Sequence, residues 1–216
     1  MKLGIISDTH DLLRPEVLSA LAGADHILHA GDISSRKILD QLQQTAPLHA
    51  VRGNADKEWA EDLPLFLDFM LEDLHVYMTH KKKDLPKDLS PYDLVVFGHS
   101  HQYSETQLGN TLLINPGSCG PRRFYQKITM AIAETGNGKI MVTKIDIAHP
   151  SASRKADPAD IRPQIEIVIR EIDKGRGKTD IAEKYGIDPA TAEQIARLYL
   201  THPGVTVDGI MTKMGL

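Results

Sequence analysis

The 216-residue chain has one cysteine and lacks any apolar stretch near the roughly 20 residues that span a membrane. A single cysteine excludes an intramolecular disulfide framework and a thiolate metal site. The formal net charge of −4 argues against a general binder of nucleic acid or membrane surfaces. The N-terminal residues lack the pattern of a secretory signal, so we expect a cytoplasmic protein.

Five short apolar runs stand out because each leads into residues that bind metals. They begin at Leu3, His26, Leu48, Val76 and Leu94. If these runs are neighbouring strands of one open sheet, the residues that follow them meet in the crevice beyond the carboxyl ends of the strands. The candidate ligands in that crevice are Asp8, His10, Asp32, Asn54, His80, His99 and His101.

The chemistry of these ligands indicates a site for two ions. Asp8 and His10 are two residues apart, so in extended chain both side chains project to the same side. Carboxylate, imidazole and amide groups suit first-row divalent ions; we expect Mn, with Ni, Co, Fe or Zn as alternatives. The set is too large for one tetrahedral ion and suits two ions bridged by Asp32. Enzymes with two metal ions about 3.5–4 Å apart hydrolyse phosphate esters, because the ions activate a water molecule and stabilise the charge that develops.

The ordered motifs resemble those of the calcineurin-type metallophosphoesterases, in particular the small bacterial and archaeal YfcE-like or MJ0936-like phosphodiesterases. The resemblance covers roughly residues 1–150 and implies an α/β (α+β) fold, with a two-sheet β-sandwich flanked by helices and metals at the strand ends. The motifs are Asp8-x-His10, Gly31-Asp32, Gly53-Asn54-x-Asp56, His80, Gly98-His99-x-His101 and Asn115-Pro116-Gly117-Ser118.

The resemblance also implies a role for each ligand. One ion is expected on Asp8, His10, Asp32 and His101, and the other on Asp32, Asn54, His80 and His99. A hydroxide between the ions is expected to attack the phosphorus. Asp32, Asn54 and His80 are therefore the expected catalytic residues.

Two departures from the family pattern bear on catalysis. Many relatives have a His at the position of Ala55, where it protonates the leaving group, and general acid catalysis contributes about 10²–10⁴-fold to the rate. Poor leaving groups should therefore react slowly here. Asp56 is expected to orient this region rather than replace the missing His. The second departure is the run Lys81-Lys82-Lys83, which follows His80. These lysines either form a solvated loop or attract an anionic substrate to the site.

Further positions are candidates for substrate contact or for packing. Arg122 and Arg123 are candidate substrate-binding residues because guanidinium groups match phosphate oxygens; the alternative is a solvated charge pair. Cys119 lacks a nearby base in the sequence, and we do not expect it to be a nucleophile. His29 is a candidate supporting residue behind the ligands.

The remaining pattern of the first part alternates helices and strands. Ser34 is a candidate N-cap of its helix. The turn at 135–138 between two alternating segments indicates a hairpin. The expected elements are helices over 15–23 and 34–44, strands over 62–79 around a turn at Glu72-Asp73, and strands over 128–134 and 139–147.

The character of the chain changes after residue 150. We expect domain boundaries of 1–150 for the phosphoesterase domain and 151–216 for a helical extension, with a linker at 151–155. Asp157-Pro158 is typical of a helix start, followed by an apolar stripe that begins at Ile161. Helices are also expected over 179–185 and 188–200, on either side of a turn at Gly186.

The two helices expected over 179–185 and 188–200 resemble a helix-turn-helix. Such a unit could read DNA with its second helix, or it could pack on the core or contact another protein. From Lys155 to Leu216 the chain has nine Lys and Arg against ten Asp and Glu. DNA-binding modules normally have a basic footprint, so we favour protein contact and consider nucleic acid an unexpected partner. Apolar residues at 198–200 and 211–216 suggest an interface, and we expect a homo-oligomer.

Together these features predict a divalent-metal-dependent phosphoesterase, and a phosphodiesterase more than a monoesterase. The expected substrate is a small phosphate ester with a good leaving group. The alternative is a scaffold or regulator of the same fold that acts through its C-terminal helices without catalysis, as the retromer scaffold subunit of this superfamily does. That subunit has lost a metal-site histidine, whereas all seven ligand positions are present here.

Overall fold

The computed structural model describes residues 1–122, 126–136, 138–148, 158–214 and 216. The described residues form two compact units, one with strands β1 to β10 and helices α1 and α2, the other with helices α3 to α6. The expected boundary at 150/151 and the linker at 151–155 lie outside the described residues.

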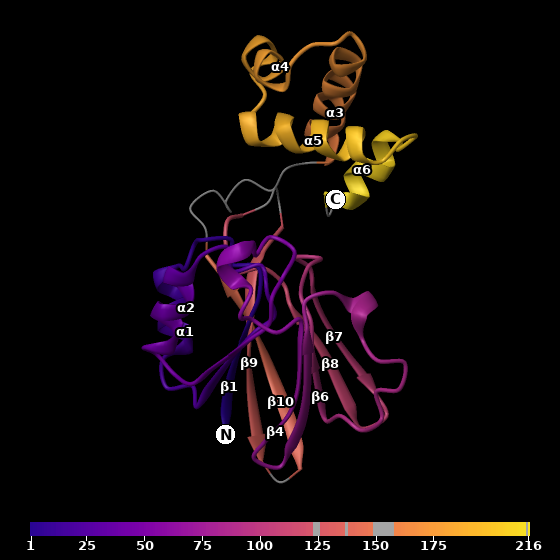
Figure 1. Ribbon diagram of the computed structural model, residues 1–216. Helices are drawn as coiled ribbons and strands as arrows, with labels where there is room; N and C mark the ends of the chain where they lie inside the picture. Colours follow the sequence, from indigo (N-terminus) through magenta and orange to yellow (C-terminus); the bar gives the residue numbers. More distant parts are fainter. Residues whose placement is uncertain (123–125, 137, 149–157, 215) are drawn as a thin grey trace. The chain divides into compact units, whose positions relative to one another are not determined.

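The first sheet of the first unit has the strand order β10-β9-β1-β2-β3 (Figure 1). Parallel pairing joins β1 to β2 and β2 to β3, whereas β9 and β10 form an antiparallel hairpin, as expected from the sequence. The strands are β1 (Lys2–Ile6), β2 (His26–His29), β3 (Leu48–Ala50), β9 (Ile128–Gly136) and β10 (Lys139–Ile147).

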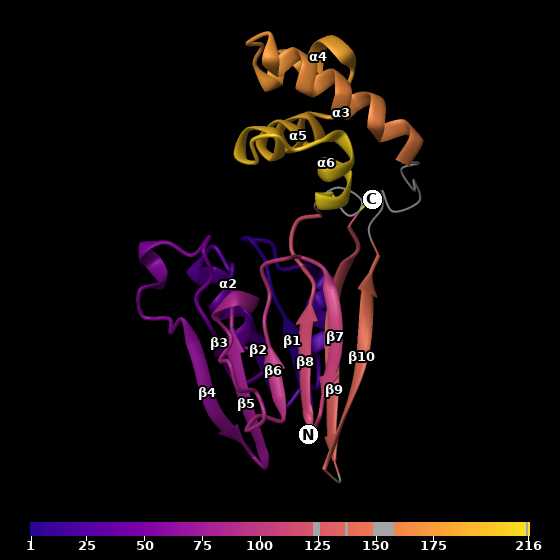
Figure 2. The ribbon, with the colours of Figure 1, turned by 90° about the vertical axis from the view of Figure 1, so that its right-hand side faces the viewer.

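The second sheet has the order β4-β5-β6-β8-β7 and lies against the first (Figure 2). Its β4–β5 hairpin turns at Glu72 and Asp73, where the sequence predicted it. The strands are β4 (Phe66–Leu71), β5 (Leu74–Thr79), β6 (Leu94–Val96), β7 (Tyr103–Leu108) and β8 (Thr111–Pro116). The two-sheet sandwich that the resemblance implied is confirmed.

The five apolar runs do not share one sheet, so that premise was wrong. The runs that begin at Leu3, His26 and Leu48 form β1, β2 and β3 of the first sheet. The run at Val76 forms the end of β5, and the run at Leu94 forms β6. Both strands belong to the second sheet. The candidate ligands therefore come from the ends of two packed sheets.

The alternating directions of side chains along each strand explain how the first sheet packs against both the second sheet and the helices. Leu3 and Ile5 of β1 are fully buried between the sheets with Met78 and Ile114 of the second sheet. Ile6, on the opposite face of β1, packs toward the helices instead. Successive side chains of a strand point to opposite faces, so one strand contributes to both cores.

Helices α1 (Pro15–Leu21) and α2 (Arg36–Gln43) cover the outer face of the first sheet (Figure 1). A side chain at Gly4 would clash with Leu21, so this glycine permits the close approach of α1. The predicted Ser34 cap was wrong: Ser35 occupies the N-cap of α2, and its hydroxyl donates to Asp11 rather than capping the helix. Two short 3₁₀ turns, Glu58–Ala60 and Lys82–Asp84, lie in the loops.

The second unit has α3 (Pro158–Asp173), α4 (Lys178–Tyr185), α5 (Pro189–Thr201) and α6 (Val207–Lys213) around its own core (Figure 2). Among the described residues, no helix of either unit is long and apolar enough to cross a lipid bilayer.

Apolar residues of all four helices of this unit meet in its core. Gly186 ends α4 with a φ of 63°, and the side chain of Asp188 caps α5 by accepting from the Thr191 N–H at 2.9 Å. The fully buried members include Ile161, Ile165, Val168, Ile181, Ala192, Ile195 and Ile210.

Helix α6 was missed by the sequence reasoning, which assigned residues 211–216 to an exposed interface. Met214 is instead fully buried in the core of the second unit, and Ile210 beside it is also buried. The expectation of an exposed apolar position holds at Leu200, which is 65% exposed.

We expect Ile195→Ala to lower the free energy of unfolding of the second unit by about 2–5 kcal/mol, because it leaves a cavity in that core. Leu200→Ala, an exposed change on the same helix, should alter it by less than about 0.5 kcal/mol. Amide hydrogen exchange reports the two units separately. Equal loss of protection in β1 and α5 after Ile195→Ala would contradict a separate core.

Candidate metal centre

The ends of β1, β2 and β6 place candidate ligands on unusual backbone. The φ angles are 56° at Asp8, 43° at His10, 56° at Asp32, 71° at His99 and 59° at His101. Non-glycine residues rarely adopt this left-handed region, which costs free energy and persists where the surrounding structure imposes it. Such strained residues cluster at functional sites, and five of the seven candidate ligands have this conformation.

Hydrogen bonds between neighbouring segments hold this backbone in place. The Asp8 N–H donates to the Gly31 carbonyl at 2.9 Å, and the His10 N–H donates to the Asp32 carbonyl at 3.0 Å. In the second sheet, the Gly98 N–H donates to the His80 carbonyl at 3.0 Å. The segments that carry the ligands are therefore bonded to one another in pairs.

The side chains form two groups that share one carboxylate. Within each group, one ligand atom from every residue lies within 4.8 Å of the others. Asp32 belongs to both groups, which is the arrangement that a bridging carboxylate requires. The groups are Asp8, His10, Asp32 and His101, and Asp32, His80 and His99.

In the first group the ligand atoms face one another closely. His101 Nε2 lies 3.1 Å from Asp8 Oδ1 and 3.3 Å from His10 Nε2, and the two imidazole rings are stacked. His10 Nε2 is 3.8 Å from both Asp8 Oδ1 and Asp32 Oδ2. Two imidazole nitrogens and two carboxylate oxygens around one point suit a cation.

In the second group, His80 is fixed by the backbone. Its Nδ1 lies 2.7 Å from the Ala30 carbonyl, which can only accept, so Nδ1 carries a proton and donates. Its Nε2 then faces Asp32 Oδ1 at 3.3 Å. A histidine that is oriented in this way through its other nitrogen is typical of metal ligands.

Whether these residues fit a metal can be judged from the buried polar atoms that make no hydrogen bond. Asp8 Oδ1 and His80 Nε2 are buried, and neither has a hydrogen-bond partner among the described residues. Buried polar atoms are normally bonded, so such atoms require an explanation. Coordination of a divalent cation would satisfy both, and the donor set fits it.

The charge state of the carboxylates also fits this role. Burial raises the pKa of Asp8, but the adjacent His101 and His80 and the Ser7 hydroxyl outweigh it and lower the pKa below its usual value. Burial acts on Asp32 in the same way, and contacts with His80 and the Ala55 N–H lower its pKa. Both groups are therefore ionised at neutral pH, as metal ligands must be.

Supporting hydrogen bonds orient the Asp8 carboxylate. Oδ2 accepts from the Ser7 hydroxyl at 2.6 Å and from the His99 N–H at 3.1 Å. This arrangement leaves Oδ1 directed at the ligand group. The sequence reasoning missed Ser7, whose position directly before the first motif was the available signal.

Asp56 orients the loops around the centre, as expected. Its Oδ1 accepts from the N–H groups of Ile33 and Ser34 at 2.8 and 2.7 Å, and its Oδ2 accepts from the Gly53 N–H at 2.8 Å. This buried carboxylate therefore ties the loop after Asp32 to the loop that carries Asn54.

The Asn115-Pro116-Gly117-Ser118 segment supports the centre from behind. Asn115 Nδ2 donates to the Gly98 carbonyl at 2.8 Å, and its Oδ1 accepts from the Gly117 N–H at 2.9 Å. The Ser118 hydroxyl donates to the Asp8 carbonyl at 2.9 Å. These residues were noticed as a motif, but their structural role was not predicted.

His29 is fully buried and hydrogen-bonds to residues next to the candidate ligands in the sequence, which agrees with the supporting role expected for it. Its Nδ1 accepts from the Gly31 N–H at 3.1 Å, and its Nε2 is 3.0 Å from the Thr9 hydroxyl. Burial lowers its pKa to about 4, so the ring is neutral at pH 7.

Burial also decides the state of Cys119. The side chain is fully buried, and burial raises the pKa of its thiol to about 12. The thiol is therefore protonated at neutral pH, and its lack of a nucleophilic role stays a prediction.

The other predicted site residues lie at the rim or outside the described part. Asn54 is exposed and lines a pocket together with His80 and Lys81. Lys82 instead lies over the Phe97 ring, with Nζ 5.7 Å from its centroid. The phosphate-clamp role of Arg122 stays a prediction, and Arg123 lies outside the described residues.

The fold and these strand-end ligands are those of a metal-binding phosphoesterase, and the chain belongs to the calcineurin-like phosphoesterase superfamily, whose domain model matches residues 1–138. It is 35% identical over 151 residues to a probable metallophosphoesterase of Methanothermobacter thermautotrophicus, covering 63% of this chain and 87% of that protein. It is 30% identical over 141 residues to the phosphodiesterase MJ0936 of Methanocaldococcus jannaschii, covering 55% and 84%.

A solved structure of an archaeal phosphodiesterase has a similar fold. The TM-score is 0.58 at 26% identity, and the match covers 67% of this chain and all of that one. These relatives support a divalent-metal phosphoesterase of the same superfamily.

We expect Gly98→Ala to weaken Mn²⁺ binding by about 10–100-fold, the range for a change beside a metal ligand. A methyl group there would clash with the Ser7 hydroxyl and lie 2.9 Å from Asp8 Oδ2. The control is Gly136→Ala, where an added methyl group meets open space. Titration calorimetry with Mn²⁺ measures both, and equal affinities for the two variants would refute this account of Asp8.

Proposed function

We propose that the protein is a divalent-metal-dependent phosphodiesterase that uses two metal ions, with Mn²⁺ as the preferred metal. The observation that carries the proposal is the pair of ligand groups joined by Asp32. Membership of a metallophosphoesterase superfamily and the phosphodiesterase names of two similar proteins support it.

The proposed ligand sets are those implied by the sequence motifs, with Asn54 as the fourth ligand of the second ion. When bound, the two ions would supply a hydroxide nucleophile and positive charge for the phosphate oxygens. The proposed sets are Asp8, His10, Asp32 and His101 for one ion, and Asp32, Asn54, His80 and His99 for the other.

The chain itself prepares this chemistry. Ser7 and the His99 backbone hold Asp8, and the Ala55 N–H donates to Asp32 Oδ1 at 2.7 Å. The Ala30 carbonyl holds His80. These contacts fix the ligands before substrate binds, which reduces the rearrangement that catalysis would otherwise require.

The same site lacks a histidine at position 55, so the leaving group receives no proton from that position. We therefore assign the enzyme to diesters whose leaving groups depart as stable anions, such as aryl esters. We also propose that the protein is cytoplasmic, forms a homo-oligomer, and uses its helical unit for protein contact.

Hydrolysis of a bis-aryl phosphate and the matching aryl monoester tests the proposal. Diester turnover should exceed monoester turnover, cease on chelation and return with Mn²⁺. Asp32→Asn and His99→Ala should each lower kcat by at least about 10²-fold, because the first removes the charge of the shared carboxylate and the second removes an imidazole ligand. The exposed changes Asp40→Asn and His202→Ala are controls and should leave kcat unchanged.

Absence of turnover with Mn, Ni, Co, Fe and Zn, in a protein that is folded, would contradict the proposal. The scaffold alternative would then become the better account. The next experiment would be to search for a partner of the helical unit.

We expect Ala55→His to accelerate an alkyl ester substrate by up to about 10²–10⁴-fold by supplying a proton to the leaving group. Hydrolysis of a p-nitrophenyl ester should change little, because its leaving group departs without a proton. A plot of log kcat/KM against leaving-group pKa should become shallower in the variant. An unchanged slope would show that another group already donates the proton.

A further inference from the structure

A pocket of about 380 Å³ opens beside the metal centre in the first unit. Asn54 and His80, both assigned to the second ion, line it, so the pocket adjoins the proposed site of reaction. A volume of this order holds a small organic group. The proposed chemistry at phosphorus leaves this pocket without a role.

An exposed aromatic ring forms one wall. Phe66 is 56% exposed and Leu65 beside it is 68% exposed, although both are large and apolar. The Phe66 ring is stacked on Tyr77, with ring centroids 5.8 Å apart and an angle of 13° between the planes. More than half of the Phe66 surface is open, and Phe66 is one of the residues that line the pocket.

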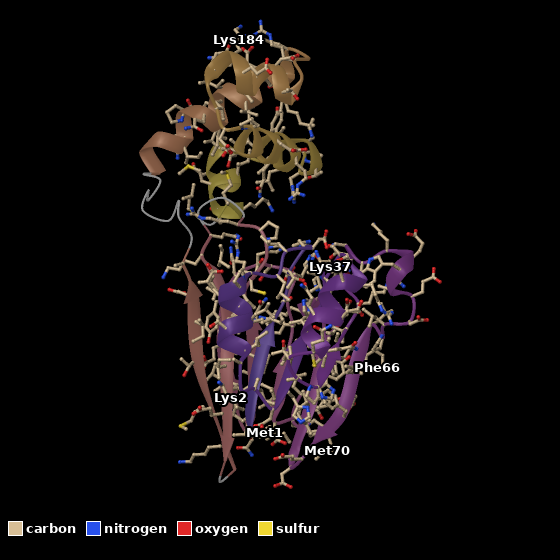
Figure 3. The ribbon with its side chains drawn as sticks, turned by 90° about the vertical axis from the view of Figure 1, so that its left-hand side faces the viewer. Met1, Lys2, Lys37, Phe66, Met70 and Lys184 are labelled. Carbon is tan, nitrogen blue, oxygen red and sulfur yellow. The ribbon has the colours of Figure 1, made fainter. Side chains whose placement is uncertain are left out.

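The sheet fixes this ring close to the ligands. Phe66 is the first residue of the edge strand β4, and its register partner is Thr79 of β5. Thr79 directly precedes His80. Figure 3 shows Phe66 and Met70 along the same strand, and Met70 is likewise 60% exposed but does not line the pocket.

The polar lining has charges of both signs. Arg52, Lys81 and Asp84 contribute to it. The Arg52 guanidinium donates to the carbonyls of Asp56 and Lys57 at 3.3 and 3.4 Å, which holds it in place. Mixed charges beside an aromatic face match a planar group with polar edges better than an alkyl chain or a second phosphate group.

We propose that this pocket binds a planar aromatic ester group of the substrate, of nucleobase size, by stacking it on Phe66. The proposal rests on the proposed phosphodiesterase function, because it places the phosphorus at the metals and one ester group in the pocket. A base stacked on an aromatic side chain contributes about 1–3 kcal/mol, which corresponds to about 5- to 140-fold in affinity. The substrate class is then a diester with at least one nucleoside or aryl group.

Titration calorimetry of the Mn²⁺-loaded protein with thymidine 5′-monophosphate and with methyl phosphate tests this inference. Both ligands have the phosphate, and only the first has a ring for the pocket. The wild type should bind the nucleotide at least 5-fold more tightly. Phe66→Ala should reduce nucleotide affinity by about 5- to 140-fold and leave methyl phosphate affinity unchanged.

Two further variants separate stacking from other effects. Phe66→Leu keeps an apolar side chain without the ring and should lose most of the nucleotide preference. Met70→Ala, an equally exposed change on β4, should lose none. In hydrolysis of thymidine 5′-p-nitrophenyl phosphate, Phe66→Ala should raise KM with little change in kcat.

The inference is wrong if the nucleotide binds no more tightly than methyl phosphate, or if Phe66→Ala leaves its affinity unchanged. It is also wrong if Phe66→Ala changes only the molar mass in solution by light scattering, since the ring would then belong to an interface between copies. If no diester is hydrolysed but the Phe66-dependent preference persists, the pocket stands and the proposed function fails.

Discussion

The carboxylate of Asp32 is the point on which the metal centre depends. It belongs to both ligand groups, its Oδ1 accepts from the Ala55 N–H, and it faces His80 at 3.3 Å. The left-handed backbone at Asp32 places it there, and Asp56 holds the adjacent loop through the N–H groups of Ile33 and Ser34. A buried carboxylate that serves two groups requires compensating positive charge, which bound divalent cations would supply.

The two-sheet architecture explains how so few residues form a dense polar site. Each sheet contributes parallel strands whose carboxyl ends lie at the same edge, and the apolar core between the sheets fixes the distance between those edges. The ligands from Asp8 and Asp32 on one sheet thereby meet His80 and His101 from the other. Packing of the apolar core and geometry of the polar site are thus coupled.

The pocket at Phe66 concerns substrate specificity, whereas the ligand groups concern the reaction. In the proposed function the ligands act at phosphorus, and in the further inference the adjoining wall selects the ester group. The ligand His80 and the wall residue Phe66 both lie at the end of the β4–β5 hairpin, because the strand that precedes His80 pairs with the strand that begins at Phe66. One hairpin therefore connects proposed catalysis and proposed substrate choice.

The sequence by itself determined the types and order of the candidate ligands and most strands, because strand periodicity and motif spacing are local properties. The resemblance also indicated Asp56 as an orienting residue, and Ala55 as the position where many relatives have a histidine. Only the tertiary structure decided that the runs divide between two sheets, that Met214 is buried, and that Phe66 lies beside His80. These depend on packing between residues far apart in the chain, and no local pattern encodes those distances.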